Sequence, residues 1–128
     1  FVHVDDAVRA NLFFLRNTDK SGVFNVGTGR SRSFNDVAVA VINACRRVEG
    51  DKPLTLEEAT RDGRLRYFSM PQNLQGKYQS FTEATIEKLT SAGYSGPWMG
   101  IEEGVGDYAT TLYETLKGGG GQAPAESE

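Results

Sequence analysis

The chain has 128 residues and a formal net charge of −3, from 14 Lys and Arg against 17 Asp and Glu. These charges are mixed along the sequence without a basic block, which speaks against a nucleic-acid surface. No apolar stretch approaches the roughly 20 residues that a membrane helix needs. The single cysteine, Cys45, cannot form an internal disulfide and favours a reduced, cytoplasmic setting.

The first part of the chain predicts strand and helix in alternation. Residues 1–4 are an apolar run typical of a strand inside a sheet. No turn precedes this run, so we expect the chain to be cut from something longer. Asp5 and Asp6 then offer N-cap oxygens to a helix. The apolar positions of that helix are Val8, Leu12 and Leu15. A second short strand is predicted at residues 23–27.

The middle of the chain predicts a second helix, an excursion and a third strand. Ser33 begins a motif like a capping box, with Asp36 in place of the usual Glu or Gln. The apolar stripe of the helix that follows consists of Val37, Val41, Ala44 and Val48. Residues 49–62 are charged and predict a surface excursion with one helical turn at 56–59. At residues 65–70, Leu65, Tyr67 and Ser69 alternate with Arg66, Phe68 and Met70, which suits a strand.

The last part predicts two further helices. One is expected to be capped by Thr82, to carry Ile86 and Leu89, and to stop at Gly93, where glycine can adopt the left-handed conformation. The other has one apolar face made of Ile101, Val105, Tyr108, Leu112 and Leu116. Residues 118–128 are glycine-rich and acidic and predict a disordered tail, which leaves 1–117 as the folded part. The alternation indicates an α/β fold whose three short strands need other strands beside them.

A glycine-rich turn at residues 27–29 lies between a predicted strand and a predicted helix. Such a turn can hold a phosphate, because backbone N–H groups and the helix N-terminus both face the anion. The dinucleotide fingerprint requires a third glycine, however, where this chain has Arg32. We therefore favour a tight connection with Arg30 and Arg32 in solvent, and assign no cofactor-binding residue.

Tyr113 and Lys117 have the Tyr-x-x-x-Lys spacing of an acid/base pair. One helical turn would bring the ammonium near the phenol and lower the pKa of the phenol. Lys117 directly precedes Gly118 at the end of the last helix, where a cation complements the helix dipole. We favour this structural role, and assign no catalytic residue.

His3 and Cys45 also have simple structural interpretations. His3 with Asp5 and Asp6 could suggest a metal, but the two carboxylates are better used in capping, so we predict a structural histidine and no metal site. Cys45 lies one helical turn after Val41 beside an apolar stripe, which favours a core thiol.

The loop around Tyr78 is the strongest candidate for binding. It follows a predicted strand end, where ligand sites of α/β proteins commonly lie. Tyr78 could stack on a ring or bond a phosphate or sugar hydroxyl, and Lys77 could pair with a phosphate. The alternative is an exposed loop with Phe81 tucked beneath it, and chemistry alone leaves both open.

Two stretches carry a family resemblance. Residues 1–8 (FVHVDDAV) and 22–29 (GVFNVGTG) resemble the C-terminal region of extended short-chain dehydrogenase/reductases, which include many nucleotide-sugar epimerases and dehydratases. Residues 70–82, with Leu89, residues 92–94, Pro97 and residues 103–105, resemble the ADP-L-glycero-D-manno-heptose 6-epimerase family. The similarity runs from residue 1 to about residue 116, apart from the charged excursion.

The resemblance implies that this chain is the C-terminal substrate-binding lobe, with the last sheet strands, of an NADP-binding Rossmann enzyme. The N-terminal half, with the glycine fingerprint and the functional Tyr-x-x-x-Lys, is then missing, and the fragment alone is expected to be inactive. The family uses NADP to oxidise and re-reduce the carbon of ADP-heptose next to the ring, on the route to the lipopolysaccharide core. Tyr78 matches the substrate-contacting tyrosine of its Gly-Lys/Arg-Tyr-Gln loop. The resemblance also implies a cytoplasmic homo-oligomer.

Three alternatives stay open. The chain could belong to another extended epimerase or dehydratase acting on UDP- or dTDP-sugars. It could belong to a non-catalytic protein that binds a nucleotide sugar and regulates another protein. It could also be an independent binding module.

Overall fold

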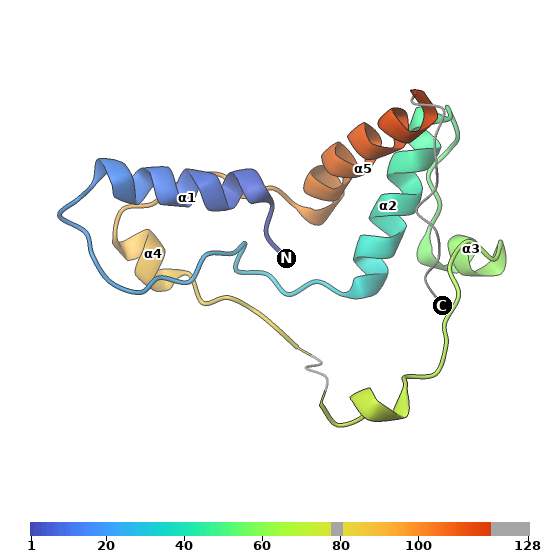
Figure 1. Cartoon of the computed structure of the whole chain (residues 1–128), viewed down its shortest axis with the longest axis horizontal. Helices are drawn as coiled ribbons and strands as arrows, with labels where there is room; N and C mark the ends of the chain where they lie inside the picture. Colours follow the sequence, from blue (N-terminus) through green and yellow to red (C-terminus); the bar gives the residue numbers. More distant parts are fainter. Residues whose placement is uncertain (78–80, 119–128) are drawn as a thin grey trace.

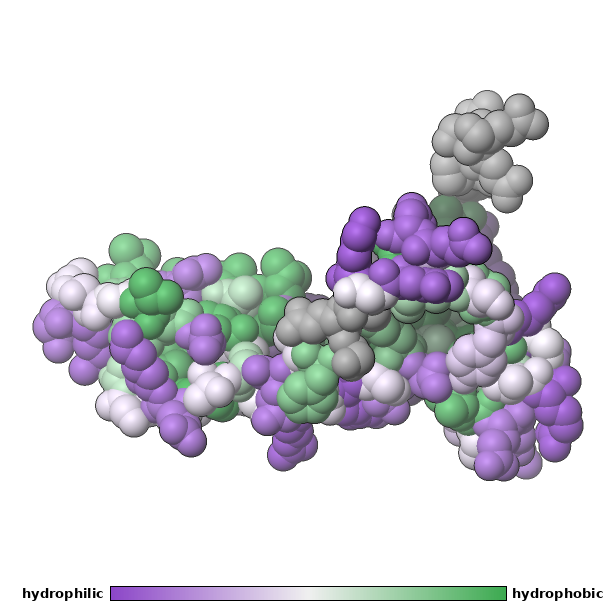
Figure 2. Space-filling view, turned by 90° about the horizontal axis from the view of Figure 1, so that it is seen from below, coloured by the Kyte–Doolittle hydropathy of each residue, from purple (hydrophilic) through white to green (hydrophobic). Residues whose placement is uncertain are grey.

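The computed structural model describes residues 1–77 and 81–118. The elements follow in the order α1 (Val4–Arg16), α2 (Phe34–Val48), α3 (Leu56–Arg61), the 3-10 turn η1 (Gln72–Leu74), α4 (Glu87–Ser91) and α5 (Ile101–Gly118). They form two lobes, with α1 above α4 in one and α2 crossing α5 in the other (Figure 1). The N-terminus lies between the lobes. Hydrophobic atoms are widely exposed on the lobe of α1 and α4 (Figure 2).

Helix α1 begins at Val4, earlier than the sequence predicts. His3 is the N-cap, and its Nδ1 atom accepts a hydrogen bond from the Asp5 N–H at 3.3 Å. The prediction that Asp5 and Asp6 are the caps is therefore wrong. Both lie in the first helical turn, where negative charge complements the positive end of the helix dipole.

Aromatic side chains form the core of the first lobe. Ala10, Leu89 and Tyr94 are buried, and Phe13, Phe14, Phe24, Val26 and Trp98 pack around them. The rings of Phe13 and Tyr94 meet edge to face, with centroids 5.4 Å apart, a favourable geometry. Helix α4 begins at Glu87 without a side-chain cap, so the predicted cap at Thr82 is wrong. The predicted stop is confirmed, because Gly93 has φ +96°.

Helix α2 of the second lobe begins with the capping box that the sequence predicts. Ser33 accepts a hydrogen bond from the Asp36 N–H at 3.1 Å, and Asp36 accepts one from the Ser33 N–H at 2.8 Å. Helix α2 then packs against α5. The residues that both helices bury are mostly small, which permits close approach: Ala40 and Ala44 on α2, and Ile101, Gly104, Gly106 and Ala109 on α5.

The excursion at 49–62 contains α3, so the predicted helical turn is confirmed and is longer than expected. The segment that leads into α3 is held to α2 by the side chain of Asn43. Its oxygen accepts a hydrogen bond from the Leu54 N–H at 2.7 Å, and its amide donates one to the Leu54 carbonyl at 2.9 Å. Thr55 and Glu58 form a second capping box.

The strands that the sequence predicts at 1–4, 23–27 and 65–70 do not form in the described part of the chain. A strand needs a neighbouring backbone to complete its ladder, and the segment 23–29 is joined to residues 84–88 through side-chain hydrogen bonds. The Lys88 ammonium donates to the Val23 carbonyl at 2.8 Å, and the Asn25 amide donates to the Thr85 carbonyl at 3.3 Å. The α/β fold class is therefore not confirmed; the described residues are helical.

Two further predictions concern the chain's second half. Helix α5 is confirmed, but the C-terminal half of its apolar face, with Tyr108, Leu112 and Leu116, is exposed. Of the tail predicted at 118–128, Gly118 is instead the last residue of α5, and residues 119–128 lie outside the described residues. None of the described helices has the length and apolar character to cross a membrane.

Candidate functional site

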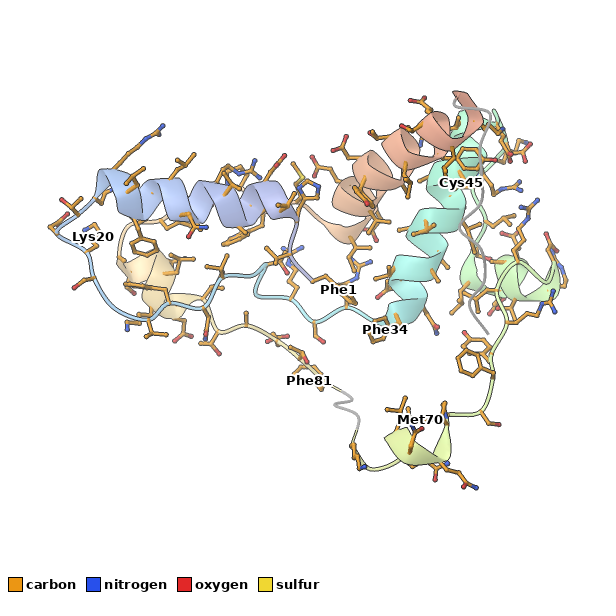
Figure 3. The ribbon with its side chains drawn as sticks, viewed as in Figure 1. Phe1, Lys20, Phe34, Cys45, Met70 and Phe81 are labelled. Atoms are coloured by element: carbon orange, nitrogen blue, oxygen red, sulfur yellow. The ribbon has the colours of Figure 1, made fainter. Side chains whose placement is uncertain are left out.

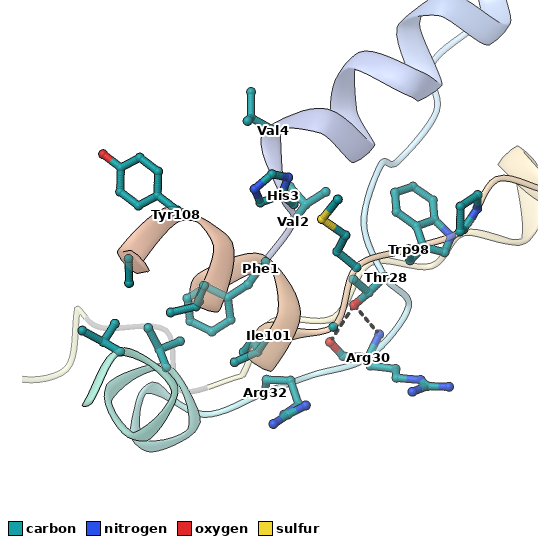
Figure 4. A pocket seen from close by; sticks show the side chains of 18 of the residues that line it. Phe1, Val2, His3, Val4, Thr28, Arg30, Arg32, Trp98, Ile101 and Tyr108 are labelled. Carbon is teal, nitrogen blue, oxygen red and sulfur yellow. Dashed lines mark hydrogen bonds between the residues drawn. The ribbon is translucent and has the colours of Figure 1, made fainter. Parts of the chain in front are cut away.

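A cavity of about 800 Å³ opens where the two lobes meet. Its walls come from the N-terminal segment, α2, the segment before α5, and α5 itself (Figure 4). Most lining side chains are apolar, including Phe1, Val37, Val41, Trp98, Ile101 and Tyr108. The polar side chains in the lining include His3, Thr28, Arg30 and Arg32, and of these the sequence analysis had considered His3, Arg30 and Arg32.

Arg32 forms ion pairs with two carboxylates, those of Asp36 and Glu102, at the edge of this cavity. Its Nε atom lies 3.1 Å from Asp36 Oδ2, and its terminal nitrogens donate to Glu102 at the start of α5. The bonds to Glu102 and Asp36 raise the pKa of Arg32. The Ser33 backbone N–H, followed by Arg32, lowers the pKa of Asp36, and Arg32 lowers that of Glu102. Arg32 is thus a structural link between two helices, and the prediction that it lies in solvent is wrong.

Arg30 is exposed and has no carboxylate partner within the described residues. Its backbone N–H and carbonyl both meet the Thr28 hydroxyl at 3.3 Å (Figure 4). The cavity therefore combines apolar walls with one uncommitted guanidinium near its edge. That arrangement supports binding. His3 also lines the cavity, with its Nδ1 atom 3.9 Å from Asp5 Oδ2, but this nitrogen accepts the hydrogen bond that caps α1.

The glycine turn at 27–29 is covered by the chain segment before α4. A Cβ atom on Gly27 would stand 2.8 Å from the Ala84 Cβ. Gly29 has φ +67°, and a Cβ there would lie 3.2 Å from Ile86. The glycines are needed for this close approach and this backbone conformation. The two glycines are therefore explained by packing against residues 84–86, without a bound phosphate.

Near the C-terminal end of α5, Tyr113 and Lys117 both interact with the Glu49 carboxylate. The Tyr113 hydroxyl donates to Glu49 Oε1 at 2.5 Å, and Lys117 Nζ lies 3.4 Å from the same oxygen. Glu49 raises the pKa of Tyr113. A catalytic tyrosine needs the opposite shift, so the geometry gives this pair a structural role that joins α5 to the end of α2.

His3 packs on the backbone of α5, where a Cβ on Gly104 would come within 3.2 Å of its ring. Its Nδ1 atom already accepts the capping bond. No group of three or more potential ligands that could hold a metal is found in the described ranges. Cys45 is half-buried on α2 (Figure 3).

Tyr78, the predicted substrate contact, lies outside the described residues. In the part of the loop that precedes Tyr78, the Gln75 side-chain amide donates a hydrogen bond to the Met70 carbonyl at 3.3 Å, and Lys77 is exposed. Met70 and Phe81 lie before and after Tyr78 in the chain (Figure 3), and neither lines the cavity. Phe81 is 64% exposed, so it is not tucked beneath the loop, whereas residues 71–77 are exposed, as the exposed-loop alternative expects. The structure does not bring the described residues of this loop to the cavity.

Sequence reasoning considered Asp6 as a helix cap and missed its role as a link between distant segments. This carboxylate is fully buried, pairs with Arg9, and accepts a hydrogen bond from the Met99 N–H at 3.0 Å. It therefore joins α1 to the segment before α5. Its partner is a backbone amide 93 positions away, and a backbone amide leaves no signal in a sequence.

The chain is similar to curated proteins of known name, whereas no family model matches it. It is 50% identical over 115 residues to "ADP-L-glycero-D-manno-heptose-6-epimerase" of Thiobacillus denitrificans, and 49% identical over 114 residues to the protein of that name in Cupriavidus pinatubonensis. These matches cover 90% and 89% of this chain but 35% and 34% of the relatives. The chain thus spans about a third of the length of the curated relatives it matches. The resemblance to the ADP-L-glycero-D-manno-heptose 6-epimerase family is therefore confirmed over nine tenths of this chain.

Proposed function

We propose that this chain is the substrate-binding part of a nucleotide-sugar epimerase that interconverts the ADP-D-glycero- and ADP-L-glycero-D-manno-heptoses at carbon six. The single observation that carries the proposal is the 50% identity, over 90% of the chain, to a protein of that name. The site geometry agrees with a binding role, because the described residues supply a mostly apolar cavity with Arg30 near its edge.

The described residues do not fit a nicotinamide dinucleotide. The glycine turn at 27–29 has Arg32 where the dinucleotide fingerprint requires a third glycine, and its glycines pack against Ala84 and Ile86. We therefore derive no step through the cofactor from this chain. In the proposed enzyme, NADP is held by a Rossmann domain that corresponds to the part of the relatives without a counterpart here. The proposed enzyme is a cytoplasmic homo-oligomer.

Within this function we propose that Tyr78 contacts the nucleotide sugar. Its support is the sequence Gly76-Lys77-Tyr78-Gln79, which matches the family's substrate-contacting loop. A phenol hydroxyl that bonds a charged phosphate contributes about 1.5–3 kcal/mol. Loss of that bond weakens binding by about tenfold or more.

The test uses a chimera in which this chain replaces the matching part of the Thiobacillus denitrificans relative. We expect it to bind NADP and to interconvert the two ADP-heptoses. Tyr78→Ala should raise KM about tenfold. The matched control is Tyr67→Ala, which should leave KM unchanged, because Tyr67 is a tyrosine 63% exposed and outside the proposed contact. Turnover of UDP- or dTDP-sugars alone would replace the proposed substrate, and bound cofactor without any turnover would favour a non-catalytic protein. Equal KM values in wild type and Tyr78→Ala would remove Tyr78 from the site.

A further inference from the structure

Arg30 carries a guanidinium group that lines the cavity and has no carboxylate partner in the described part of the chain. The other arginine of the lining, Arg32, is held by Asp36 and Glu102. A guanidinium presents its N–H donors in a planar fork that matches the oxygens of a phosphate. Arg30 therefore keeps its donors for a ligand, whereas Arg32 has used its own within the fold.

The backbone around Arg30 is held in place while its side chain stays exposed. The Thr28 hydroxyl accepts a hydrogen bond from the Arg30 N–H and donates one to the Arg30 carbonyl, both at 3.3 Å (Figure 4). One residue later, the Ser31 N–H donates to Glu83 Oε2 at 3.1 Å. Glu83 thus reaches this segment and bonds its backbone rather than the Arg30 guanidinium. A binding group on a fixed backbone loses less freedom when its ligand arrives.

The contact between Ser31 and Glu83 also connects Arg30 with the loop that contains Tyr78. Glu83 follows Tyr78 by five positions, and five residues span at most about 18 Å when fully extended. Residues 84–86 continue along the turn at 27–29, against which Ala84 and Ile86 pack. One ligand made of a base, a diphosphate and a sugar can therefore meet Arg30 and Tyr78 with different groups.

The walls of the cavity suit the base of such a ligand. Trp98 lines the cavity and is half-buried, and its ring packs against Tyr94 with centroids 5.5 Å apart. An aromatic ring held in this way can stack on a flat heterocycle. The volume of about 800 Å³ falls within the range of small-molecule sites, which combine apolar and aromatic walls with a few polar groups. Arg30 is the polar group that carries a free charge in this lining.

We infer that Arg30 binds the diphosphate group of the nucleotide sugar, with the base against the apolar walls of the cavity. The inference rests on the proposed function and adds a contact to that of Tyr78. A guanidinium bonds phosphate oxygens with two parallel, charge-assisted hydrogen bonds. Removal of such a contact weakens binding by about tenfold or more.

The test uses the chimera described above with saturating NADP, so that added nucleotides compete with the sugar nucleotide alone. KM for ADP-heptose is measured together with the inhibition constants of ADP and adenosine. Arg30→Met should raise KM and the inhibition constant of ADP about tenfold or more. The inhibition constant of adenosine should stay unchanged, because adenosine has no phosphate. Arg30→Lys should recover part of the loss, since an ammonium keeps the charge without the fork.

The matched control is Arg61→Met. Arg61 lies on α3 with its side chain 74% exposed, and it does not line the cavity. All three constants should therefore stay at their wild-type values in this variant. A change equal to that in Arg30→Met would show a general effect of surface charge and would overturn the inference.

Two further results would overturn it. Unchanged KM and unchanged ADP inhibition in Arg30→Met would remove Arg30 from the site. Equal losses for ADP and adenosine would mean that Arg30 shapes the cavity and does not bind phosphate. If the chimera has no turnover, calorimetric titration with ADP and adenosine in the presence of NADP makes the same comparison. An inactive chimera whose ADP binding depends on Arg30 contradicts only the proposed function, and an active chimera whose constants do not depend on Arg30 contradicts only this inference.

Discussion

At the scale of single residues, Asp6 shows how one side chain connects the two lobes. Its carboxylate is fully buried, and both of its contacts, Arg9 and the Met99 N–H, are polar. A buried charge is tolerated only where such partners replace water. Truncation would leave the Arg9 guanidinium without its anion and the Met99 amide without its acceptor.

Asp6→Ala should lower the free energy of unfolding by about 3 kcal/mol, the cost of breaking a buried ion pair. Urea unfolding followed by circular dichroism measures it. The control is Asp5→Ala, because Asp5 is an exposed neighbour in the same helical turn. Its loss should cost less than about 1 kcal/mol, the range of a helix-dipole interaction. Equal losses in the two variants would refute the structural role of Asp6.

At the scale of elements, Arg32 holds the beginning of α2 to the beginning of α5. The arginine lowers the pKa of Glu102, and together with the Ser33 N–H it lowers that of Asp36. A carboxyl group whose folded pKa is depressed stabilises the fold at a pH above its unfolded value. That stability begins to fall as the pH drops below the ordinary values of 4.5 for Glu102 and 3.8 for Asp36, and is gone below the folded values.

The loss of stability between pH 7 and pH 3 should therefore be smaller in Arg32→Met than in wild type. At pH 7 the variant should be less stable by about 0.5 kcal/mol, which is typical of exposed ion pairs. Arg30→Met, two positions earlier and without a carboxylate partner in the described ranges, should follow the wild-type profile. Urea midpoints measured across this pH range give the comparison. Identical profiles in all three proteins would mean that the link does not stabilise the fold.

Elements that depend on neighbours in sequence were predictable. The capping box of Ser33 and Asp36 and the stop at Gly93 are set within a few residues, so the sequence contains all that they need. The strand predictions failed for the opposite reason. An alternating pattern describes a segment that suits a sheet, but a ladder forms only when another backbone lies beside it.

At the scale of the whole molecule, the 128-residue chain should have no epimerase activity and should bind no NADP. Its described residues contain no uncovered phosphate-binding turn, and Tyr113 has a pKa raised by Glu49. Incubation with both ADP-heptoses, followed by chromatography of the products, tests activity, and equilibrium dialysis tests cofactor binding. Turnover by the purified chain would contradict the prediction. The chimera provides the positive control.

The sequence by itself determined the helices at 34–48 and 101–118, the capping motifs and the family resemblance, because these depend on local order of residue types. Only the tertiary structure decided that Asp6 and Arg32 are links between distant segments, that Gly27 and Gly29 lie against residues 84–86, and that an apolar cavity opens between the lobes. Each of these results depends on contacts between residues far apart in the chain. Such contacts follow from how helices pack, which a one-dimensional pattern of residue types does not specify.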